Sequence, residues 1–338
     1  MNIQNKFDTL ENLIGNTPLL EIKLSYKGKI RKIYAKAEYY NFTGSIKDRM
    51  AFHILKKAYN NGSIKEGYTI VEATSGNTGI AFSAIGRFLG HNVIIYMPDW
   101  MSTERKALLK AYGAEIRYVT RKEGGFIGSV EKSRKYAYNN PNTFFPNQFS
   151  NTDNTDAHSF TTGPEIVKQL NSIKTSVDAI VAGVGTGGTL CGIGNYLKTV
   201  NSNIKIYPLE PESCPTISTG SQIGEHRIEG IADQFIPDII KNSKLDEVIT
   251  VNDGDAILMA QKLSKQLGIG VGISSGANLL GALKVQDLIG FDKNVITVFA
   301  DDCKKYLSTD YSKNEPIKNE YITPNVELIS FKSIPCIR

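Results

Sequence analysis

Residues 68–97 read YTIVEATSGNTGIAFSAIGRFLGHNVIIYM, and this stretch decides the fold class. Residues 68–73 form a short apolar run typical of a buried strand, and a helix follows from about Thr78 to Leu89, where Gly90 closes it. Residues 92–97 are the next strand, which Pro98 ends. Because a helix separates the two strands, they are expected to lie parallel in a sheet that helices cover on both faces.

The same wiring continues along the chain. A helix capped by Ser102 or Thr103 runs to Gly113, and residues 114–119 form another strand. A second series consists of strands at 177–182, 204–209 and 294–299 and helices that end near 198 or span about 254–267 and 276–289. We therefore expect an α/β fold with two open, twisted, mostly parallel sheets and helices on both faces.

A polar segment at residues 146–160 is the expected domain junction, which gives an N-terminal domain at 1–150 and a C-terminal domain at 151–338. From about Ser312 the alternation of strands and helices stops. Residues 326–331 are predicted to be either an edge strand or a dimer contact. In open sheets of this kind, ligands bind beyond the carboxyl ends of the strands, so the loops that follow strands carry the functional information.

Composition excludes several classes of protein. The net charge is only +5 over 338 residues, with both signs interspersed, which favours a small anionic ligand over nucleic acid. The first residues lack the apolar core of a signal peptide, and no apolar run is long enough to span a membrane, so a cytoplasmic location is expected. The four cysteines and four histidines are scattered, which predicts reduced thiols and no metal site.

The loop GVGTGGT at residues 183–189 follows a strand and opens a helix. Glycines let backbone N–H groups approach an anion, and the helix start adds partial positive charge, so a phosphate is the expected guest. Taken alone, the loop also fits a dinucleotide-binding fingerprint, because Gly183, Gly185 and Gly188 match its glycines and Glu210 ends the next strand.

Three further loops offer related chemistry. Residues 74–79, TSGNTG, alternate hydroxyls and glycines at a helix start, which suits a carboxylate. Lys47 lies in the first turn of a helix that Ser45 is predicted to cap, where the helix dipole favours the neutral amine that forms a Schiff base. Residues 272–276, GISSG, place two hydroxyls at another helix start, where they could cap the helix or bind a ring nitrogen.

Together these motifs closely resemble the cysteine synthase and cystathionine β-synthase family of fold-type II pyridoxal phosphate enzymes, whose fold is like that of the tryptophan synthase β-subunit. The resemblance runs from LIGNTPL at residues 13–19 to KYLST at residues 305–309. Between them stand GSIKDR at 44–49, TSGNTG at 74–79, TTGPEI at 161–166, GTGGT at 185–189 and GISSG at 272–276. A dinucleotide would leave all but one of these loops without a role.

The resemblance implies a role for each motif. Lys47 would be the Schiff-base lysine and the base that moves the α-proton, and Ser274 would face the pyridine nitrogen as a neutral hydroxyl, which favours β-elimination over transamination. The remaining roles fall to two groups: cofactor binding by Asn77, Gly185, Thr186, Gly187, Gly188 and Thr189, and binding of the substrate carboxylate by Thr74, Ser75, Asn77, Thr78 and Gln148.

The β-substituent and the nucleophile are less clear. The chain departs from the family pattern at Phe42 and Thr43, at Ala73, and at Asp233, where ordinary cysteine synthases have a small uncharged residue. The primary expectation is a cysteine synthase-like reaction, in which O-acetylserine and sulfide give cysteine. A cysteine hydroxyl-lyase is the alternative, in which cysteine and water give serine and hydrogen sulfide and Asp233 is the base. The non-functional interpretation of Asp233 is an exposed aspartate in a surface loop.

Two further possibilities stay open: a serine or threonine dehydratase, and a non-catalytic ligand-binding or partner-binding protein, against which the intact Lys47 argues. The resemblance also implies pyridoxal 5'-phosphate as cofactor, a small amino-acid substrate and a homodimer. No nucleic-acid or membrane partner is expected.

Overall fold

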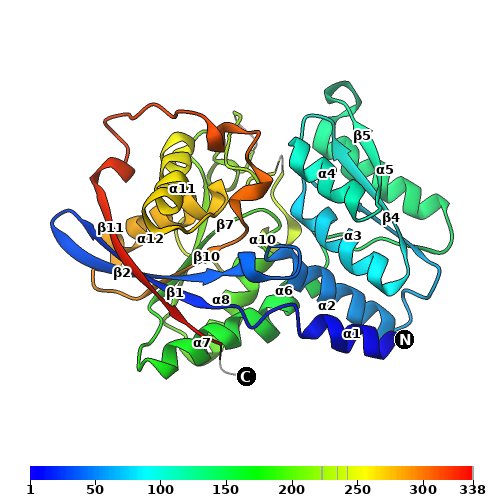
Figure 1. The fold of residues 1–338 in the computed structure, drawn as a ribbon, viewed down its shortest axis with the longest axis horizontal. Coiled ribbons are helices and arrows are strands. Elements are labelled where there is room, and N and C mark those ends of the chain that lie inside the picture. Colours follow the sequence, from blue (N-terminus) through cyan, green and yellow to red (C-terminus); the bar gives the residue numbers. More distant parts are fainter. Residues whose placement is uncertain (222–223, 234, 242, 337–338) are drawn as a thin grey trace.

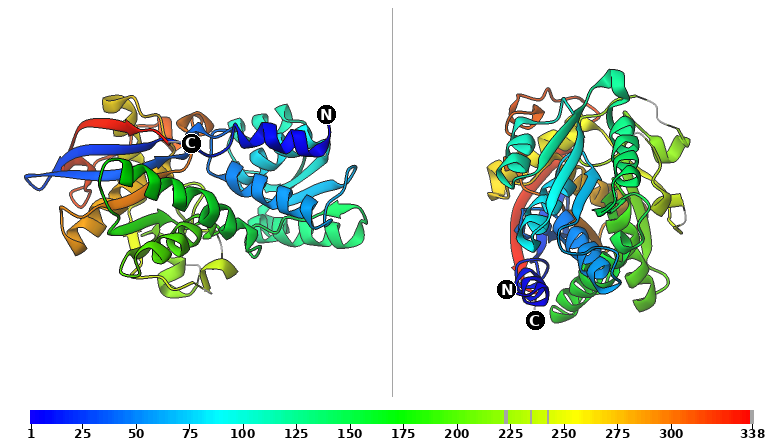
Figure 2. Two further views of the ribbon diagram at one scale, coloured as in Figure 1. Left: turned by 90° about the horizontal axis from the view of Figure 1, so that it is seen from below. Right: turned by 90° about the vertical axis from the view of Figure 1, so that its right-hand side faces the viewer.

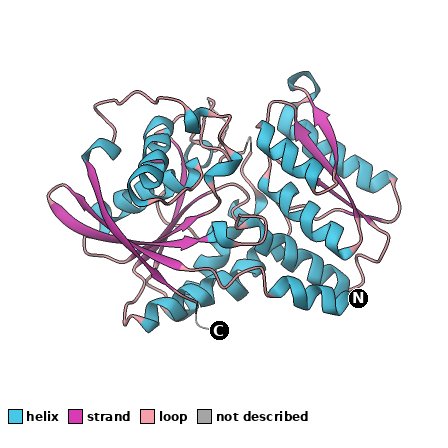
Figure 3. Cartoon of the chain, viewed as in Figure 1, coloured by secondary structure: helices cyan, strands magenta, loops and turns pink. Residues whose placement is uncertain are grey.

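The chain forms two lobes, each built around its own sheet (Figure 1). The computed structural model describes residues 1–221, 224–233, 235–241 and 243–336. Helices pack against both sheets (Figure 3). We call the seven-stranded sheet with α7, α8, α11 and α12 the large lobe, and the four-stranded sheet with α1–α5 the small lobe.

The strands of the large lobe, in spatial order, are β11 (Val326–Ile334), β1 (Leu19–Tyr26), β2 (Lys29–Ala37), β10 (Val295–Phe299), β7 (Ala179–Gly183), β8 (Lys205–Pro211) and β9 (Ile249–Val251). Those of the small lobe are β5 (Glu115–Val119), β4 (Asn92–Pro98), β3 (Thr69–Ala73) and β6 (Thr143–Phe144). All strand pairs are parallel except β1 with β2 and β1 with β11. The expected α/β class with mostly parallel sheets is confirmed.

The helices of the small lobe are α1 (Ile3–Glu11), α2 (Lys47–Asn60), α3 (Asn77–Leu89), α4 (Thr103–Ala111) and α5 (Gly125–Asn139). The rest of the chain contributes α6 (Asp153–Ala157), α7 (Gly163–Ser172), α8 (Gly188–Val200), α9 (Thr216–Thr219), α10 (Asp238–Lys241), α11 (Asp253–Leu267) and α12 (Ile273–Ile289). A π-helical turn, His158–Thr162, joins α6 to α7.

Alternation along the central strands produces the two layers of the large lobe. Ile180 of β7 and Ile296 of β10 pack on α7 and α8, whereas Val181 and Val295 pack on α11 and α12. These side chains are 0% exposed, and burying each one stabilises the fold by roughly 1.5–3 kcal/mol. The sequence therefore reads as continuous apolar runs because helices cover both faces of the sheet.

The two sheets do not divide the chain at a single point. β1 and β2 lie in the N-terminal part of the sequence, yet they pair with β11 and β10 in the large lobe. Figure 2 shows the blue hairpin and the red β11 at the end of the molecule away from the cyan small lobe. The division at residue 150 stays a sequence-based prediction, and the sheets cross it because the hairpin completes the large sheet. Residues 326–331 belong to an edge strand.

One local feature opens the large sheet toward the small lobe. β7 and β10 pair only through Val295 with Ala179 and Ile296 with Ile180. Beyond that point Asn278 of α12 bridges the two strands, because its Oδ1 accepts from the Gly183 N–H at 2.8 Å and its Nδ2 donates to the Val298 carbonyl at 2.6 Å. The strands thus separate at their carboxyl ends, which is where ligands of α/β proteins bind.

Candidate active site

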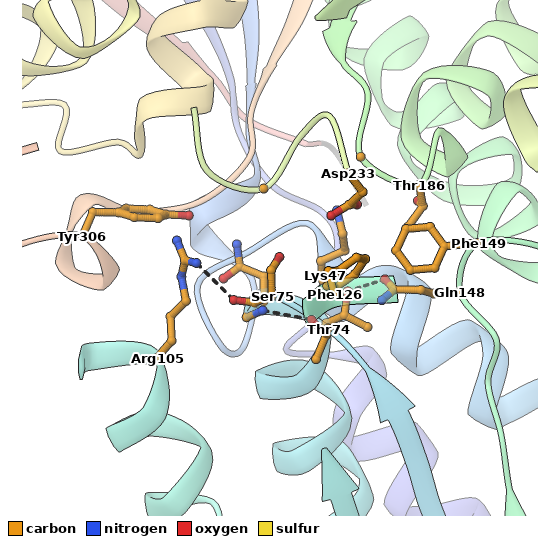
Figure 4. A pocket seen from close by; sticks show the side chains of 15 residues that line it. Lys47, Thr74, Ser75, Arg105, Phe126, Gln148, Phe149, Thr186, Asp233 and Tyr306 are labelled. Carbon is orange, nitrogen blue, oxygen red and sulfur yellow. Dashed lines mark hydrogen bonds between the residues drawn. The ribbon is translucent and has the colours of Figure 1, made fainter. Parts of the chain in front are cut away.

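Two adjoining cavities lie at the carboxyl ends of the strands, between the lobes. Their common wall consists of Lys47, Asn77, Gly185, Thr186, Gly230 and Tyr306. The cavity on the large-lobe side reaches Thr189 and Ser274. The other is lined by the loop from Thr74 to Thr78 and by Asp233 (Figure 4). Of the site residues predicted from the sequence, all except Gly188 line one of these two cavities, and Gly188 is next to Gly187 and Thr189 in the chain.

Lys47 is the first residue of α2, and the helix begins one residue later than predicted. Ile46 occupies the capping position without a side-chain bond, and the Ser45 Oγ accepts from the Lys47 N–H at 3.3 Å. Burial lowers the pKa of the Lys47 amine, although the charges of Asp301 and Asp233 oppose this effect. Both burial and the helix start favour the neutral amine at this position.

The loop from Thr74 to Thr78 is fixed from behind. Gln148 donates its Nε2–H to the Ala73 carbonyl at 2.8 Å, and its Oε1 accepts from the Thr78 hydroxyl at 2.7 Å. The carboxyl group of Glu72 accepts from the backbone N–H groups of Ala73 and Gln148. Because Gln148 forms hydrogen bonds at both ends of the loop, it helps to fix the conformation of the loop in addition to lining the cavity.

The glycine loop at the start of α8 has the properties of an anion cradle. Gly187 is left-handed, with φ +84°, and a Cβ on Gly188 would lie 2.0 Å from Asn154 Oδ1, so neither position accepts a side chain. Among the described residues, none accepts from the backbone N–H groups of Gly185, Thr186 or Gly187. These donors at a helix start are available for a phosphate.

Two residues of the polar segment 151–162 support this cradle. Asn154 Nδ2 donates to Thr186 Oγ1 at 2.9 Å, and His158 Nε2 lies 3.3 Å from Thr189 Oγ1. Burial lowers the pKa of His158 well below its usual range, so the ring is neutral at physiological pH. Sequence reasoning assigned no role in the site to Asn154 or His158, which lie in the segment 146–160 that it treated as the domain junction.

Ser274 and Asn77 line the large-lobe cavity from opposite lobes. Ser274 lies in the first turn of α12 and is 5% exposed. Asn77 begins α3, where its Nδ2 donates to Asp301 Oδ2 at 2.7 Å and its Oδ1 accepts from Lys305 Nζ at 2.9 Å. The side chain of Asn77 is thus fixed in orientation and retains one amide hydrogen for a further acceptor.

Asp233 extends from the loop at residues 229–233 toward Lys47 (Figure 4). Loss of water around the carboxyl group raises its pKa to about 6, and the charge of Lys47 acts in the opposite direction. A carboxyl group with this pKa is mostly ionised at neutral pH and still basic enough to accept a proton. The carboxyl group of Asp233 therefore lines the same cavity as the Lys47 amine in a form that is mostly charged at neutral pH.

Comparison with known proteins identifies the family. A family model described as pyridoxal-phosphate dependent enzyme matches residues 10–301. The chain belongs to this family. It is 40% identical over 299 residues to a probable cysteine synthase of Bacillus subtilis, which covers 88% of this chain and 96% of that protein. The predicted family, enzyme class and cofactor, pyridoxal 5'-phosphate, are confirmed, and the chain is a pyridoxal phosphate-dependent enzyme of the cysteine synthase type.

Solved structures of the same family superpose closely. A hydrogen sulfide-producing enzyme from Fusobacterium nucleatum is 57% identical, with a TM-score of 0.96 over 98% of this chain and 99% of that chain. A variant of that enzyme, in which asparagine replaces an aspartate, was solved in complex with an α-aminoacrylate intermediate and gives 58% identity and a TM-score of 0.94 over 96% and 98% of the two chains.

The residues of this pyridoxal phosphate-dependent enzyme fit the cofactor. The free N–H groups of the glycine loop suit its phosphate, and Lys47, with a lowered pKa, suits a Schiff base. Asp301 Oδ1 is buried and has no hydrogen-bond partner within the described part of the chain. Among the described residues no group of three His, Cys, Asp or Glu side chains could hold a metal, and none of the described helices is long and apolar enough to cross a membrane.

Sequence reasoning missed several residues that shape this site. Arg105 and Phe126 come from α4 and α5, Phe149 follows Gln148, and Tyr306 belongs to the KYLST motif. Only Phe149 and Tyr306 lie in or next to a residue or motif that the sequence analysis singled out, and could have been found there. Arg105 is a basic residue on an amphipathic helix, and nothing in its local sequence distinguishes it from a solvent-exposed arginine.

Proposed function

We propose that this enzyme converts L-cysteine and water to L-serine and hydrogen sulfide. The observation that carries the proposal is the position of Asp233, a carboxyl group with a pKa near 6 that points into the cavity beside Lys47. The 57% identity to a hydrogen sulfide-producing enzyme supports release of sulfide. A small amino-acid substrate suits the cavity, because most of the loops that line it carry the sequence motifs shared with cysteine synthases.

In the proposed reaction the loop from Thr74 to Thr78, with Gln148, binds and orients the substrate carboxylate. Pyridoxal phosphate supplies the electron sink that labilises the α-proton and the β-substituent. The Lys47 amine takes the α-proton, and the β-thiol leaves with the C–S bonding pair as hydrosulfide, which becomes hydrogen sulfide with the proton that Asp233 takes from water in the next step.

Asp233 then takes one proton from water while the water oxygen bonds to the β-carbon, and Lys47 returns a proton to the α-carbon. The products, serine and hydrogen sulfide, contain all the atoms of cysteine and water. Ser274 lines the large-lobe cavity, whereas Asp233 lines the other cavity.

The decisive experiment replaces Asp233 with asparagine in the cofactor-loaded enzyme. With L-cysteine as the substrate, we expect serine formation to fall about a hundredfold, in line with loss of a general base, while the first turnover still releases sulfide. Asp292→Asn, at an exposed position, is the matched control and should form serine at the wild-type rate. Serine production by Asp233→Asn that keeps pace with the wild type would exclude Asp233 as the base.

Synthesis of cysteine from O-acetylserine and sulfide is the second candidate, and it is favoured by the 40% identity to a probable cysteine synthase. It uses the same carboxylate loop and Lys47 and needs no second base to activate the nucleophile, because hydrosulfide is already a nucleophile. The two candidates separate on kcat/KM, measured for cysteine breakdown and for O-acetylserine with sulfide. A much larger value for the second reaction would make this chain a cysteine synthase.

We further propose that the enzyme is a cytoplasmic homodimer. Large apolar side chains, among them Leu13, Phe42 and Phe160, stay exposed on neighbouring segments, and Phe160 is 68% exposed. The Asn41–Gly15 and Arg49–Thr161 hydrogen bonds bring these segments together. Light scattering of the purified protein would give twice the chain mass of 37.2 kDa, and a monomer mass would exclude the dimer.

A further inference from the structure

Arg105 crosses from one wall of the cleft to the other. It lies in the first turn of α4 in the small lobe, and its side chain is only 3% exposed. Its Nη1 donates to the Ser75 carbonyl at 3.1 Å, and its guanidinium lies 4.8 Å from the centre of the Tyr306 ring. Arg105 thus fixes the back of the loop that receives the substrate carboxylate.

The contact with Ser75 is tight and specific. A Cβ on Gly76 would lie 2.4 Å from Arg105 Cδ, so the loop and the arginine pack against one another without a gap. A lysine in this position would offer one ammonium nitrogen in place of the two spaced guanidinium nitrogens, so it could not reproduce the geometry of both contacts.

Glu229 completes the bridge from the other side. Its carboxylate forms an ion pair with Arg105 Nη2, across 124 residues of sequence, and 26% of its side chain is exposed. Glu229 lies four residues before Asp233 on the same loop. The guanidinium therefore links the carboxylate-binding loop of the small lobe to the loop that carries the proposed base.

The segment between Glu229 and Asp233 has a single, constrained shape. Gly230 and Ala232 are both left-handed, with φ +90° and +53°, and the alanine conformation costs roughly 1 kcal/mol. The Ala232 N–H donates to the Val184 carbonyl at 2.7 Å, and the Ala232 carbonyl lies 3.0 Å from His226 Nε2. With Ala232 fixed on the large lobe, Glu229 ties the start of this loop to the small lobe, and beyond Asp233 the ring of Phe235 stacks on Phe126 of α5.

We propose that Arg105 and Glu229 are positioning residues that hold Asp233 over the reacting carbon. This inference rests on the proposed function of Asp233. When the pair is intact, the substrate carboxylate and the base are held by two loops joined through one guanidinium. When the ion pair is broken, the 229–233 loop keeps its contacts to the large lobe but is no longer linked to the loop that binds the substrate carboxylate. Asp233 then no longer activates water next to the β-carbon.

The experiment uses Arg105→Gln, Glu229→Gln and the double variant in the cofactor-loaded enzyme with L-cysteine. Sulfide, serine and pyruvate are measured together, since pyruvate and ammonia are the products when water is not added at the β-carbon. We expect the serine-to-pyruvate ratio to fall about tenfold in each variant, which corresponds to 1.4 kcal/mol, while sulfide release by Glu229→Gln stays within about threefold of wild type. Arg105→Lys should be intermediate.

The double variant distinguishes a shared function from two separate effects. If both side chains act only through their ion pair, either single substitution already removes the whole effect. The double variant should then have a serine-to-pyruvate ratio no lower than that of the poorer single variant. Multiplicative losses would mean that each side chain acts alone and would overturn the proposal, as would an unchanged product ratio. If Arg105→Gln fails to fold, Glu229→Gln alone still tests the proposal, because Glu229 is the more exposed partner and its substitution should be better tolerated.

A second readout does not depend on activity. Hydrogen–deuterium exchange of the segment 226–233 should increase in both single variants, with and without cofactor, and stay unchanged in Lys110→Gln, an exposed residue of the same helix. If Asp233→Asn itself leaves serine formation intact, the proposed function fails whatever the bridge does. If Asp233→Asn abolishes serine while the bridge variants keep the wild-type ratio and exchange, the bridge alone is disproved.

Discussion

At the scale of single residues, Asp233 connects the structure to a pH dependence. Its pKa of about 6 lies above the usual aspartate value, so the carboxyl group is protonated and inactive as a base below about pH 6. Lys47 in its charged form lowers this pKa, so a neutral Lys47 amine would move the midpoint upward. We expect serine formation from cysteine to fall as the pH drops through about 6, measured as kcat between about pH 5 and 9.

The same pH profile of Asp233→Asn tests whether the decrease near pH 6 is due to Asp233. Residual serine formation by this variant should no longer respond to pH near 6. Asp301 and Lys305 also lie near Lys47 and are unaltered in the variant. An acid limb of unchanged midpoint in Asp233→Asn would assign the titration to another group of the site.

At the scale of elements, the end of β3 depends on Glu72. This side chain is 1% exposed and has no cationic partner among the described residues, and burial raises its pKa to about 8. Glu72 keeps its proton in the folded state while the unfolded chain releases it above its ordinary pKa of 4.5. The contribution of Glu72 to stability is therefore greatest in acid and decreases as the pH rises from about 4.5 toward 8.

Glu72→Gln isolates this effect, because the amide cannot titrate. We expect the variant to be less stable than wild type near pH 5.5 and the difference in unfolding free energy to shrink by up to about 1.4 kcal/mol per pH unit toward pH 7.5. Urea unfolding at several pH values measures it. A difference that does not change with pH would mean that Glu72 is ionised in the folded protein.

What the sequence predicts at this scale, and what it does not, has a physical basis. The strands around Ile180 and Ile296 and the loops at Lys47 and Thr74 follow from local patterns of apolar residues, glycines and hydroxyls. Three other features do not follow from local patterns. The pairing of the β1–β2 hairpin with β10 and the Arg105–Glu229 ion pair depend on partners more than a hundred residues away. The bridge between β7 and β10 depends on the single amide side chain of Asn278, one among many in the sequence. Periodicity carries no information about such partners.

At the scale of the whole molecule, a buried charge cluster holds α2, and with it Lys47, against the large lobe. Arg49 of α2 pairs with Glu38 and with Glu165 of α7, at 2.6 and 2.7 Å, and Glu165 also pairs with Lys36 of β2. The two cations and two anions balance. Glu165 has a pKa lowered to about 2, chiefly because it binds Arg49, although burial opposes this shift.

Glu165→Gln would leave two buried cations facing one anion. Losing one partner of a buried ion pair costs about 3–5 kcal/mol, and we expect a loss of stability of about 3 kcal/mol in urea unfolding near pH 7, because the shared network retains Glu38. Arg121→Gln, which breaks an exposed pair with Glu225, is the control and should unfold at nearly the wild-type urea concentration.

The pH dependence of this difference tests its electrostatic origin. A lowered pKa means that the stabilising contribution of Glu165 is complete above the ordinary value of 4.5 and disappears only as the pH falls toward 2. The destabilisation of Glu165→Gln should therefore be constant from about pH 5 to 8 and diminish in stronger acid. Because the same cluster fixes the start of α2, the variant that retains its fold should also bind pyridoxal phosphate more weakly, whereas a purely local packing defect would leave cofactor affinity unchanged.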